Sequence, residues 1–284
     1  MGTSNRSRGS SSATPLVPSF LASDPTGDTT APPSGSPEPA SPNQPPPPLP
    51  PLPPAAHIPE RFRAARTGFT RFSRTRDEGT LRRALGNYVT RGTGGRHGAL
   101  QRTGSSRATA AAMASFARTA QTEGTAAALR SIGLARCIGR PAGEVLPELL
   151  EAMCPDGGRI DEGIAREAFQ SAIVDFAEQD LPAIEELTIE QWNVLLIDFL
   201  VRSIQLRVIA DIGQRALDVP IDVARALEAE IVMRNVIYAT VTREVSAALD
   251  RIGTVSEQRM QEVTDLAYER AWGAFEAFAE DEAP

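Results

Sequence analysis

The chain has 284 residues, of which 23% are charged, and a formal net charge of −7. This length allows one or two domains, and two cysteines are too few for the disulfide framework of a small secreted protein. No apolar leader follows Met1, and no hydrophobic run is long and uncharged enough to cross a membrane. We therefore expect a cytoplasmic protein that makes no contact with a membrane.

Gly2 is the first residue of interest, because the chain contains no lysine and all 29 basic residues are arginines. Once Met1 is removed, the α-amine of Gly2 is the only aliphatic primary amine in the sequence. An α-amine titrates near about 8, against about 10.4 for lysine, so part of it is neutral and nucleophilic at neutral pH. Two interpretations stay open: an arginine-rich composition with an ordinary start, or an amine presented to another enzyme.

Residues 1–60 hold 17 of the 23 prolines, together with many serines, threonines and glycines. Such a composition buries too little apolar surface to offset the entropy of ordering, so we expect a disordered tail. The proline run at residues 45–54 favours a stiff polyproline II spacer, although its PxxP patterns also suit a ligand for a recognition domain.

Charge divides the chain into three segments. Residues 1–60 carry a net charge of −2, residues 61–119 carry +11, and residues 120–284 carry −16. Asymmetry of this kind indicates an interaction surface, either with a partner or between the two halves of the chain.

The basic segment, residues 61–119, is rich in arginine and glycine, and we expect it to be only partly helical until it binds. The pattern predicts a short helix over Thr80–Gly86, a loop over Thr90–Gly98 and a helix over Ser105–Gln121. Arginines interleaved with aromatic residues could bind nucleic acid, an acidic protein or the acidic part of the same chain. The candidate partner-binding residues are Arg82, Arg83, Arg91 and Arg96.

Residues 120–284 show apolar side chains at helical spacing throughout, and we expect them to form an all-α bundle that folds on its own. Capping boxes at residues 188–191 and 254–257 predict the starts of two helices. The expected helices cover Gly143–Met153, Asp161–Gln179, a segment from Thr188 to near Gly213, Asp222–Ile252, and a last helix after Thr254.

No catalytic, metal or cofactor motif is found. The chain has two histidines, His57 and His97, and neither stands in a catalytic spacing. Cys137 and Cys154 lack the spacing of a zinc site and are expected to be core residues. The acidic cluster of Asp175, Glu178 and Asp180 fits a solvated helix face better than a paired-carboxylate site. We therefore expect a protein that is not an enzyme, with an unrecognised acidic site as the competing possibility.

The opening MGTSNRSRGSSSATPLVPSF, with Thr14-Pro15-Leu16-Val17-Pro18, resembles the start of the QatB family of the Qat anti-phage defence system. The family's motif is typically followed by tryptophan, whereas Ser19-Phe20 follow here. The stretch from Arg82 to Val89 and the nearby Gly94-Gly95-Arg96 are similar to the family's arginine-rich centre.

The resemblance implies three partners: a P-loop ATPase, a QueC-like enzyme and a TatD-like nuclease. It also implies a non-catalytic role in which the QueC-like enzyme couples a deazaguanine carboxyl group to Gly2. The alternative is an adaptor that binds nucleic acid through the arginine-rich segment.

Overall fold

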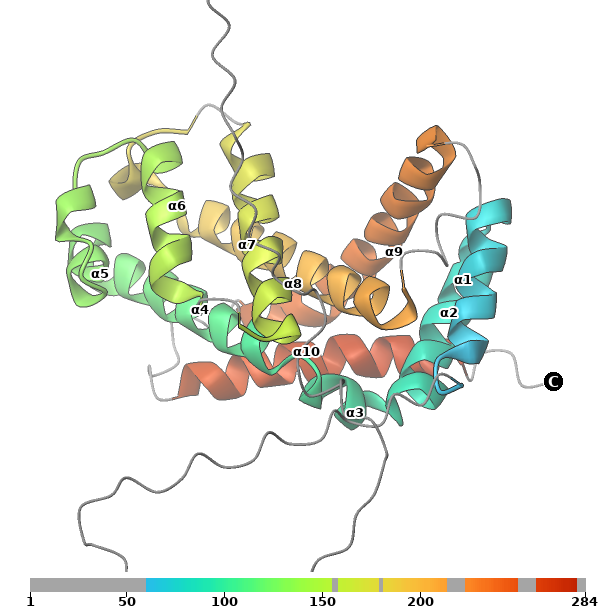
Figure 1. The fold of residues 1–284 in the computed structure, drawn as a ribbon. Coiled ribbons are helices and arrows are strands. Elements are labelled where there is room, and N and C mark those ends of the chain that lie inside the picture. Colours follow the sequence, from blue (N-terminus) through green and yellow to red (C-terminus); the bar gives the residue numbers. More distant parts are fainter. Residues whose placement is uncertain (1–59, 155–157, 179–180, 214–222, 250–258, 280–284) are drawn as a thin grey trace, which may run out of the picture. The chain divides into compact units, whose positions relative to one another are not determined.

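A computed structural model describes residues 60–154, 158–178, 181–213, 223–249 and 259–279, and every regular element within these ranges is a helix (Figure 1). The all-α prediction is confirmed. The expectations for the tail, including Gly2 and the proline run, fall outside the described residues. The elements are α1 (Arg63–Thr75), α2 (Glu78–Asn87), the π-helical turn η2 (Tyr88–Thr93), α3 (Arg96–Gln101), α4 (Gly104–Glu123), α5 (Thr125–Ser131), the 3-10 turn η3 (Ala135–Cys137), α6 (Ala142–Met153), α7 (Ile160–Ala177), the 3-10 turn η4 (Ile184–Glu186), α8 (Ile189–Ile212), α9 (Val223–Leu249) and α10 (Met260–Ala277).

Helices α4, α8 and α10 run through the middle of the bundle, with α5 to α7 at one end and α1 and α2 at the other (Figure 1). Helix α8 contacts α4, α7 and α9, whereas α10 contacts α2, α3, α4 and α9. The largest fully buried side chains come from both the basic and the acidic segments, and they include Phe69, Phe72, Tyr88, Phe169, Phe199, Tyr268 and Trp272. One hydrophobic core therefore joins the two segments.

Local chemistry explains where α8 begins and ends. The Thr188 hydroxyl accepts a hydrogen bond from the Gln191 amide at 3.3 Å, and the Gln191 side chain accepts one from the Thr188 amide at 2.8 Å. This is the capping box expected at the start of α8. Gly213 then ends α8 with a φ of 82°, a conformation that favours glycine. The second expected capping box, at residues 254–257, lies outside the described residues.

The basic segment contains more helix than the two stretches expected at residues 80–86 and 105–121. Residues 63–87 form two helices, and residues 90–98, expected as a loop, contain most of η2 and the start of α3. The charge boundary expected at residue 120 falls inside the continuous helix α4. These residues are ordered because their aromatic and aliphatic side chains are buried in the common core, which charge alone did not indicate.

Gly86 does not end a helix as expected, because α2 continues to Asn87. A Cβ atom at position 86 would lie 2.6 Å from the backbone nitrogen of Ala279, beyond the end of α10. The glycine therefore permits close contact between α2 and the chain after α10, rather than a change in backbone direction.

Candidate partner-binding surfaces

The arginines of the basic segment are in part neutralised inside the molecule. Four of them form ion pairs with the acidic helices: Arg76 with Glu228 at 3.1 Å, Arg96 with Glu269 at 3.6 Å, Arg102 with Asp211 at 2.6 Å, and Arg107 with Asp265 at 2.6 Å. These contacts reach α8, α9 and α10. The sequence left three partners open for the basic segment: nucleic acid, an acidic protein, or the acidic part of the same chain. The structure shows contacts with the acidic part of the same chain.

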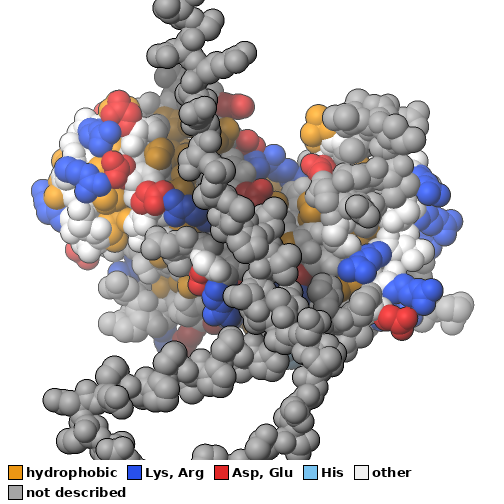
Figure 2. Space-filling model, viewed as in Figure 1, with side chains coloured by type: hydrophobic (Ala, Val, Ile, Leu, Met, Phe, Trp, Pro, Cys, Tyr) orange, Lys and Arg blue, Asp and Glu red, His pale blue; other side chains and the backbone are white. Residues whose placement is uncertain are grey.

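The four candidate partner-binding arginines lie in different settings. The Arg82 guanidinium lies 5.3 Å from the centre of the Phe278 ring, and Arg96 pairs with Glu269 on α10. Arg83 is exposed and donates to the Thr80 hydroxyl at 3.5 Å, while Arg91 is exposed on η2. All four are exposed, but Arg82, Arg83 and Arg96 also make contacts within the bundle (Figure 2 shows arginine side chains over α1 and α2).

A buried polar network forms around Asp211, near the C-terminal end of α8. Its carboxylate, only 6% exposed, accepts hydrogen bonds from Arg102 at 2.6 and 2.8 Å and from the Tyr88 hydroxyl at 2.8 Å. Arg207 completes the network, since its Nε lies 4.0 Å from Asp211 and its Nη1 donates to the Arg102 carbonyl at 3.0 Å. Burial, and then the negative charge of Asp211, raise the pKa of Tyr88 well above its usual range.

Phe62 covers this network on one side. Its ring stacks on Tyr88 with the centroids 5.5 Å apart, and the Arg102 guanidinium lies 5.7 Å from the Phe62 centroid. A Cβ atom at Gly92 would lie 2.5 Å from the Phe62 ring, so only glycine leaves room for it. Arg61 donates to the Gly92 carbonyl and fixes the same contact.

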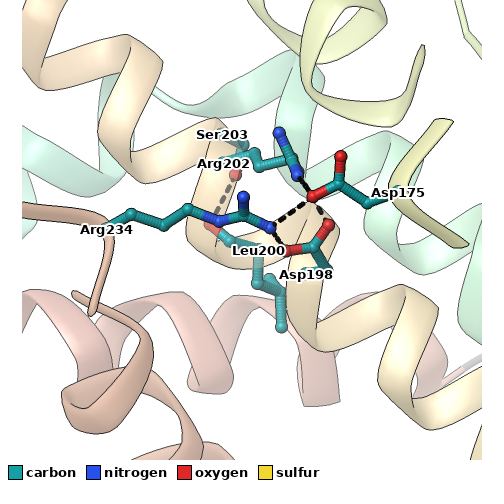
Figure 3. A network of polar contacts seen from close by, with 6 residues as sticks. All are labelled: Asp175, Asp198, Leu200, Arg202, Ser203 and Arg234. Atoms are coloured by element: carbon teal, nitrogen blue, oxygen red, sulfur yellow. Dashed lines mark hydrogen bonds and ion pairs between the residues drawn. The ribbon is translucent and has the colours of Figure 1, made fainter. Parts of the chain in front are cut away.

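A second cluster of charged residues lies where α7, α8 and α9 meet (Figure 3). Arg234 donates to Asp175 at 2.9 Å and to Asp198 at 2.8 Å, and Arg202 donates to Asp198 at 2.7 Å and also to Asp175. The Asp175 side chain is 45% exposed and that of Arg234 is 35% exposed, so this cluster borders water. Hydrogen bonds to the two aspartates raise the pKa of Arg234 in spite of the burial that lowers it.

The charged cluster forms one side of a groove of about 170 Å³, which we call the α7–α9 groove. Its lining comes from three helices and consists of Ala172, Asp175, Phe176, Val194, Leu195, Asp198, Arg234 and Tyr238. Val194 and Tyr238 are 48% and 44% exposed, so the groove presents apolar surface to solvent beside the charges. From the sequence alone Asp175 was expected on a solvated acidic face, and its partners Arg202 and Arg234 were not expected. The pattern Asp198–Arg202 at i, i+4 was the available signal.

The residues with reactive side chains do not assemble into a recognisable site within the described ranges. Cys137 and Cys154 are buried free thiols, and burial raises the pKa of Cys154. His97 is exposed on α3, whereas His57, Asp180 and Gly2 fall outside the described residues. Among the described residues no group of three or more His, Cys, Asp or Glu side chains could hold a metal ion. None of the described helices has the length and hydropathy to cross a membrane.

Comparison with known proteins gives one result. A family model described as QatB, Qat anti-phage system associated protein QatB, matches residues 94–275, which is more than half of the chain. The match starts at the glycines before α3 and ends in α10, so it includes α8 and the charged residues of both clusters, but not Tyr88 or Phe62. No curated protein and no solved structure matches the chain.

Proposed function

Because the chain belongs to the QatB family and is thus a component of the Qat anti-phage defence system, we propose that it acts there as a non-catalytic acceptor protein. In this proposal the α-amine of Gly2 attacks a deazaguanine carboxyl group that a QueC-like enzyme has activated with ATP. The new bond is an amide, the leaving group is the nucleotide on the activated carboxyl, and the amine loses its extra proton to solvent.

The absence of lysine is the observation that carries this proposal. With 29 arginines and no lysine, the α-amine of Gly2 has no competing aliphatic amine in the sequence. Arginine keeps its proton at any physiological pH, whereas an α-amine near about 8 is partly neutral. Glycine also lacks a Cβ atom, which helps the amine to enter a narrow site.

The described helices support a binding role for the rest of the chain. The arginines that pair with acidic helices tie the bundle together, and the exposed groups around the α7–α9 groove leave a surface for other proteins. We propose that the P-loop ATPase and the TatD-like nuclease of the same system dock on the helical bundle. The QueC-like enzyme acts on the tail.

Mass spectrometry of the N-terminal peptide tests the acceptor role. The full chain is co-expressed with the QueC-like enzyme, and we expect the peptide Gly2–Arg6 to carry the added deazaguanine mass. Gly2→Leu should abolish both the modification and defence, while Ser4→Leu places the same side chain nearby and keeps the acceptor. An unmodified Gly2–Arg6 peptide in cells that resist phage would contradict the proposal.

A specific observation also favours the nucleic-acid adaptor. Arg71, Arg74 and Arg91 are exposed and form no ion pair with another described residue. Exposed arginines of this kind can neutralise phosphates, and their contribution falls as salt rises. The double variant Arg71→Glu, Arg74→Glu should then weaken duplex binding and flatten its salt dependence in a gel-shift assay. Loss of assembly with the protein partners at unchanged duplex binding would instead favour a protein interface.

A further inference from the structure

Helix α9 carries a solvent-facing stripe that contains no charged side chain. The stripe begins at Leu227 and Ile231, has Asn235 at its middle, and ends at Tyr238 and the half-buried Thr242. Leu227, Ile231 and Tyr238 are 57%, 49% and 44% exposed. At 3.6 residues per turn these positions fall within about 80° of the helix circumference and extend roughly 22 Å along it. Isolated exposed apolar residues are ordinary, whereas a continuous stripe of this length indicates an interaction surface.

The opposite face of α9 belongs to the bundle. Helix α9 packs on α8, α10, α1 and α2, and the side chains that it buries include Met233, Ile237 and Val241. Arg234 lies beside the stripe, where it lines the α7–α9 groove. The stripe is therefore a surface next to the groove, and Tyr238 belongs to both.

Asn235 gives the stripe a polar midpoint that can pair with a copy of itself. A side-chain amide has both donor and acceptor atoms, so two asparagines that meet across a two-fold axis can bond to each other. A single Asn within an apolar helix seam fixes the register of paired helices at a cost in stability. With the axis at Asn235, two antiparallel helices bring Ile231 of one copy against Tyr238 of the other.

The charges beside the stripe are also self-complementary. Glu228 and Arg243 lie on the same flank of the stripe, one before and one after Asn235 at nearly equal separations. A two-fold axis perpendicular to α9 keeps this flank in common, so Glu228 of each copy meets Arg243 of the other. Their side chains are 60% and 64% exposed and so remain accessible, although they also pair with Arg76 and Glu244 within the chain.

We propose that α9 pairs antiparallel with α9 of a second copy of this chain, about a two-fold axis at Asn235. The stripe has no charge that would require an oppositely charged partner, and its central amide pairs with itself. The flanking charges match when the stripe meets a reversed copy of itself, which favours a second copy over an unrelated protein. The inference goes beyond the acceptor role and is independent of any modification at Gly2.

Sedimentation equilibrium of the full chain alone tests the pairing. We expect the mass to rise with concentration from that of one chain to twice that mass. Ile231→Glu places a carboxylate on the stripe and should weaken association about tenfold or more, whereas Leu266→Glu, at an exposed position of α10, should leave it unchanged. A mass that stays at one chain at the highest soluble concentration would overturn the proposal, as would association that Ile231→Glu leaves intact.

Charge reversal separates pairing from folding. Glu228→Arg and Arg243→Glu should each weaken the dimer, and the double variant should recover it, because the exchanged charges meet again across the axis. The ion pairs with Arg76 and Glu244 are not restored in the double variant, so the recovery cannot come from contacts within the chain. A double variant that associates no better than the weaker single variant would contradict the proposed register.

Crosslinking tests the orientation and the occupant. On oxidation, chains with Glu228→Cys should link to chains with Arg243→Cys in a mixture, and neither should link to itself. The native Cys137 and Cys154 are buried, and Leu266→Cys is the control. Self-linking of Glu228→Cys would mean parallel helices and would overturn the proposal.

The full chain with Asn235→p-benzoylphenylalanine, co-expressed with the other Qat-system proteins, identifies the occupant in cells. We expect a link to α9 of a second copy, located by mass spectrometry. A link to another protein or to nucleic acid in its place would overturn the proposal, whatever the state of Gly2.

Discussion

Helix α8 carries two arginine–aspartate clusters that differ mainly in their access to water. The cluster at Asp211 is closed: its carboxylate is 6% exposed, is covered by Phe62 and Tyr88, and is held by Arg102. The cluster at Asp198 is open, because its neighbours Asp175 and Arg234 are 45% and 35% exposed at the rim of a groove. The same pair of side chains is thus used once to join the basic and acidic parts of the chain and once to border a groove that is open to solvent.

Deleting the basic segment should reduce stability most, because the deletion breaks the closed cluster at Asp211 and keeps the open cluster at Asp198. The fragment 120–284 retains Asp175, Asp198, Arg202 and Arg234 but lacks Arg102 and Tyr88. Composition predicted that this fragment folds alone, whereas packing predicts that it does not, since Trp272 would lose the Tyr88 ring against which it packs. We expect the fragment to show helical circular dichroism without a cooperative melt. A cooperative melt near that of the full chain would show that the closed cluster is dispensable.

Asp211→Ala should cause the next largest loss in the free energy of unfolding. The substitution leaves Arg102, Arg207 and the Tyr88 hydroxyl without their buried acceptor. Loss of one partner from a buried ion pair costs about 3–5 kcal/mol, and we expect about 3 kcal/mol because Arg102 is 32% exposed. Urea denaturation measures this cost, and Asp211→Asn, which keeps one acceptor oxygen, should lose less. A loss below about 1 kcal/mol would mean that Asp211 contributes no more than a solvent-exposed ion pair, as expected for the open cluster.

Alkaline pH should lower the folding stability through ionisation of Tyr88, by less than Asp211→Ala does. The pKa of Tyr88 is raised in the folded protein, so the hydroxyl keeps its proton there after the unfolded chain begins to lose it near about 10. Its contribution to stability is therefore complete below that pH and declines as the pH rises above it. Urea midpoints at pH 9, 10 and 11 should fall more steeply for the native chain than for Tyr88→Phe. A decline remains in the variant, because the pKa of buried Tyr268 is also raised.

Asp175→Ala should have the smallest effect on stability. Its carboxylate is 45% exposed, and Arg202 and Arg234 can still pair with Asp198 after its removal. Exposed ion pairs contribute at most about 1 kcal/mol, so the melting temperature should shift only slightly. Glu167→Ala, on the same helix, is the matched control, since Glu167 is exposed and has no ion pair with another described residue. A loss as large as that of Asp211→Ala would remove the distinction between the two clusters.

Sequence patterns predicted the structural features that are set by residues close together in the chain. The capping box of Thr188 and Gln191 fixes the start of α8 through contacts three residues apart, and it was recognised for that reason. Helical spacing of apolar residues likewise predicted the all-α fold. The buried state of Cys137 and Cys154 followed from their chemical type.

Contacts between distant parts of the chain were not predictable in this way. Arg102 and Asp211 are 109 residues apart, and nothing in either neighbourhood identifies the other as its partner. Gly86 was interpreted as a helix stop because the backbone it lies against, at Ala279, is remote in sequence. The α7–α9 groove was missed for the same reason, since Asp175, Asp198 and Arg234 come from three helices.

The position of Phe62 determines how the bundle would respond to a force applied to the chain before it. It is the first buried side chain of the described chain, and it is seated between the Tyr88 ring, the Arg102 guanidinium and the space left by Gly92. A pull on the preceding residues would strain the Arg61–Gly92 hydrogen bond and then the Phe62 ring. Extraction of its ring would admit water to Asp211 while the hydrogen bonds of α8 remained intact. Because the Phe62 carbonyl also accepts a hydrogen bond from the Arg66 amide at the start of α1, the same movement would release the first hydrogen bond of that helix.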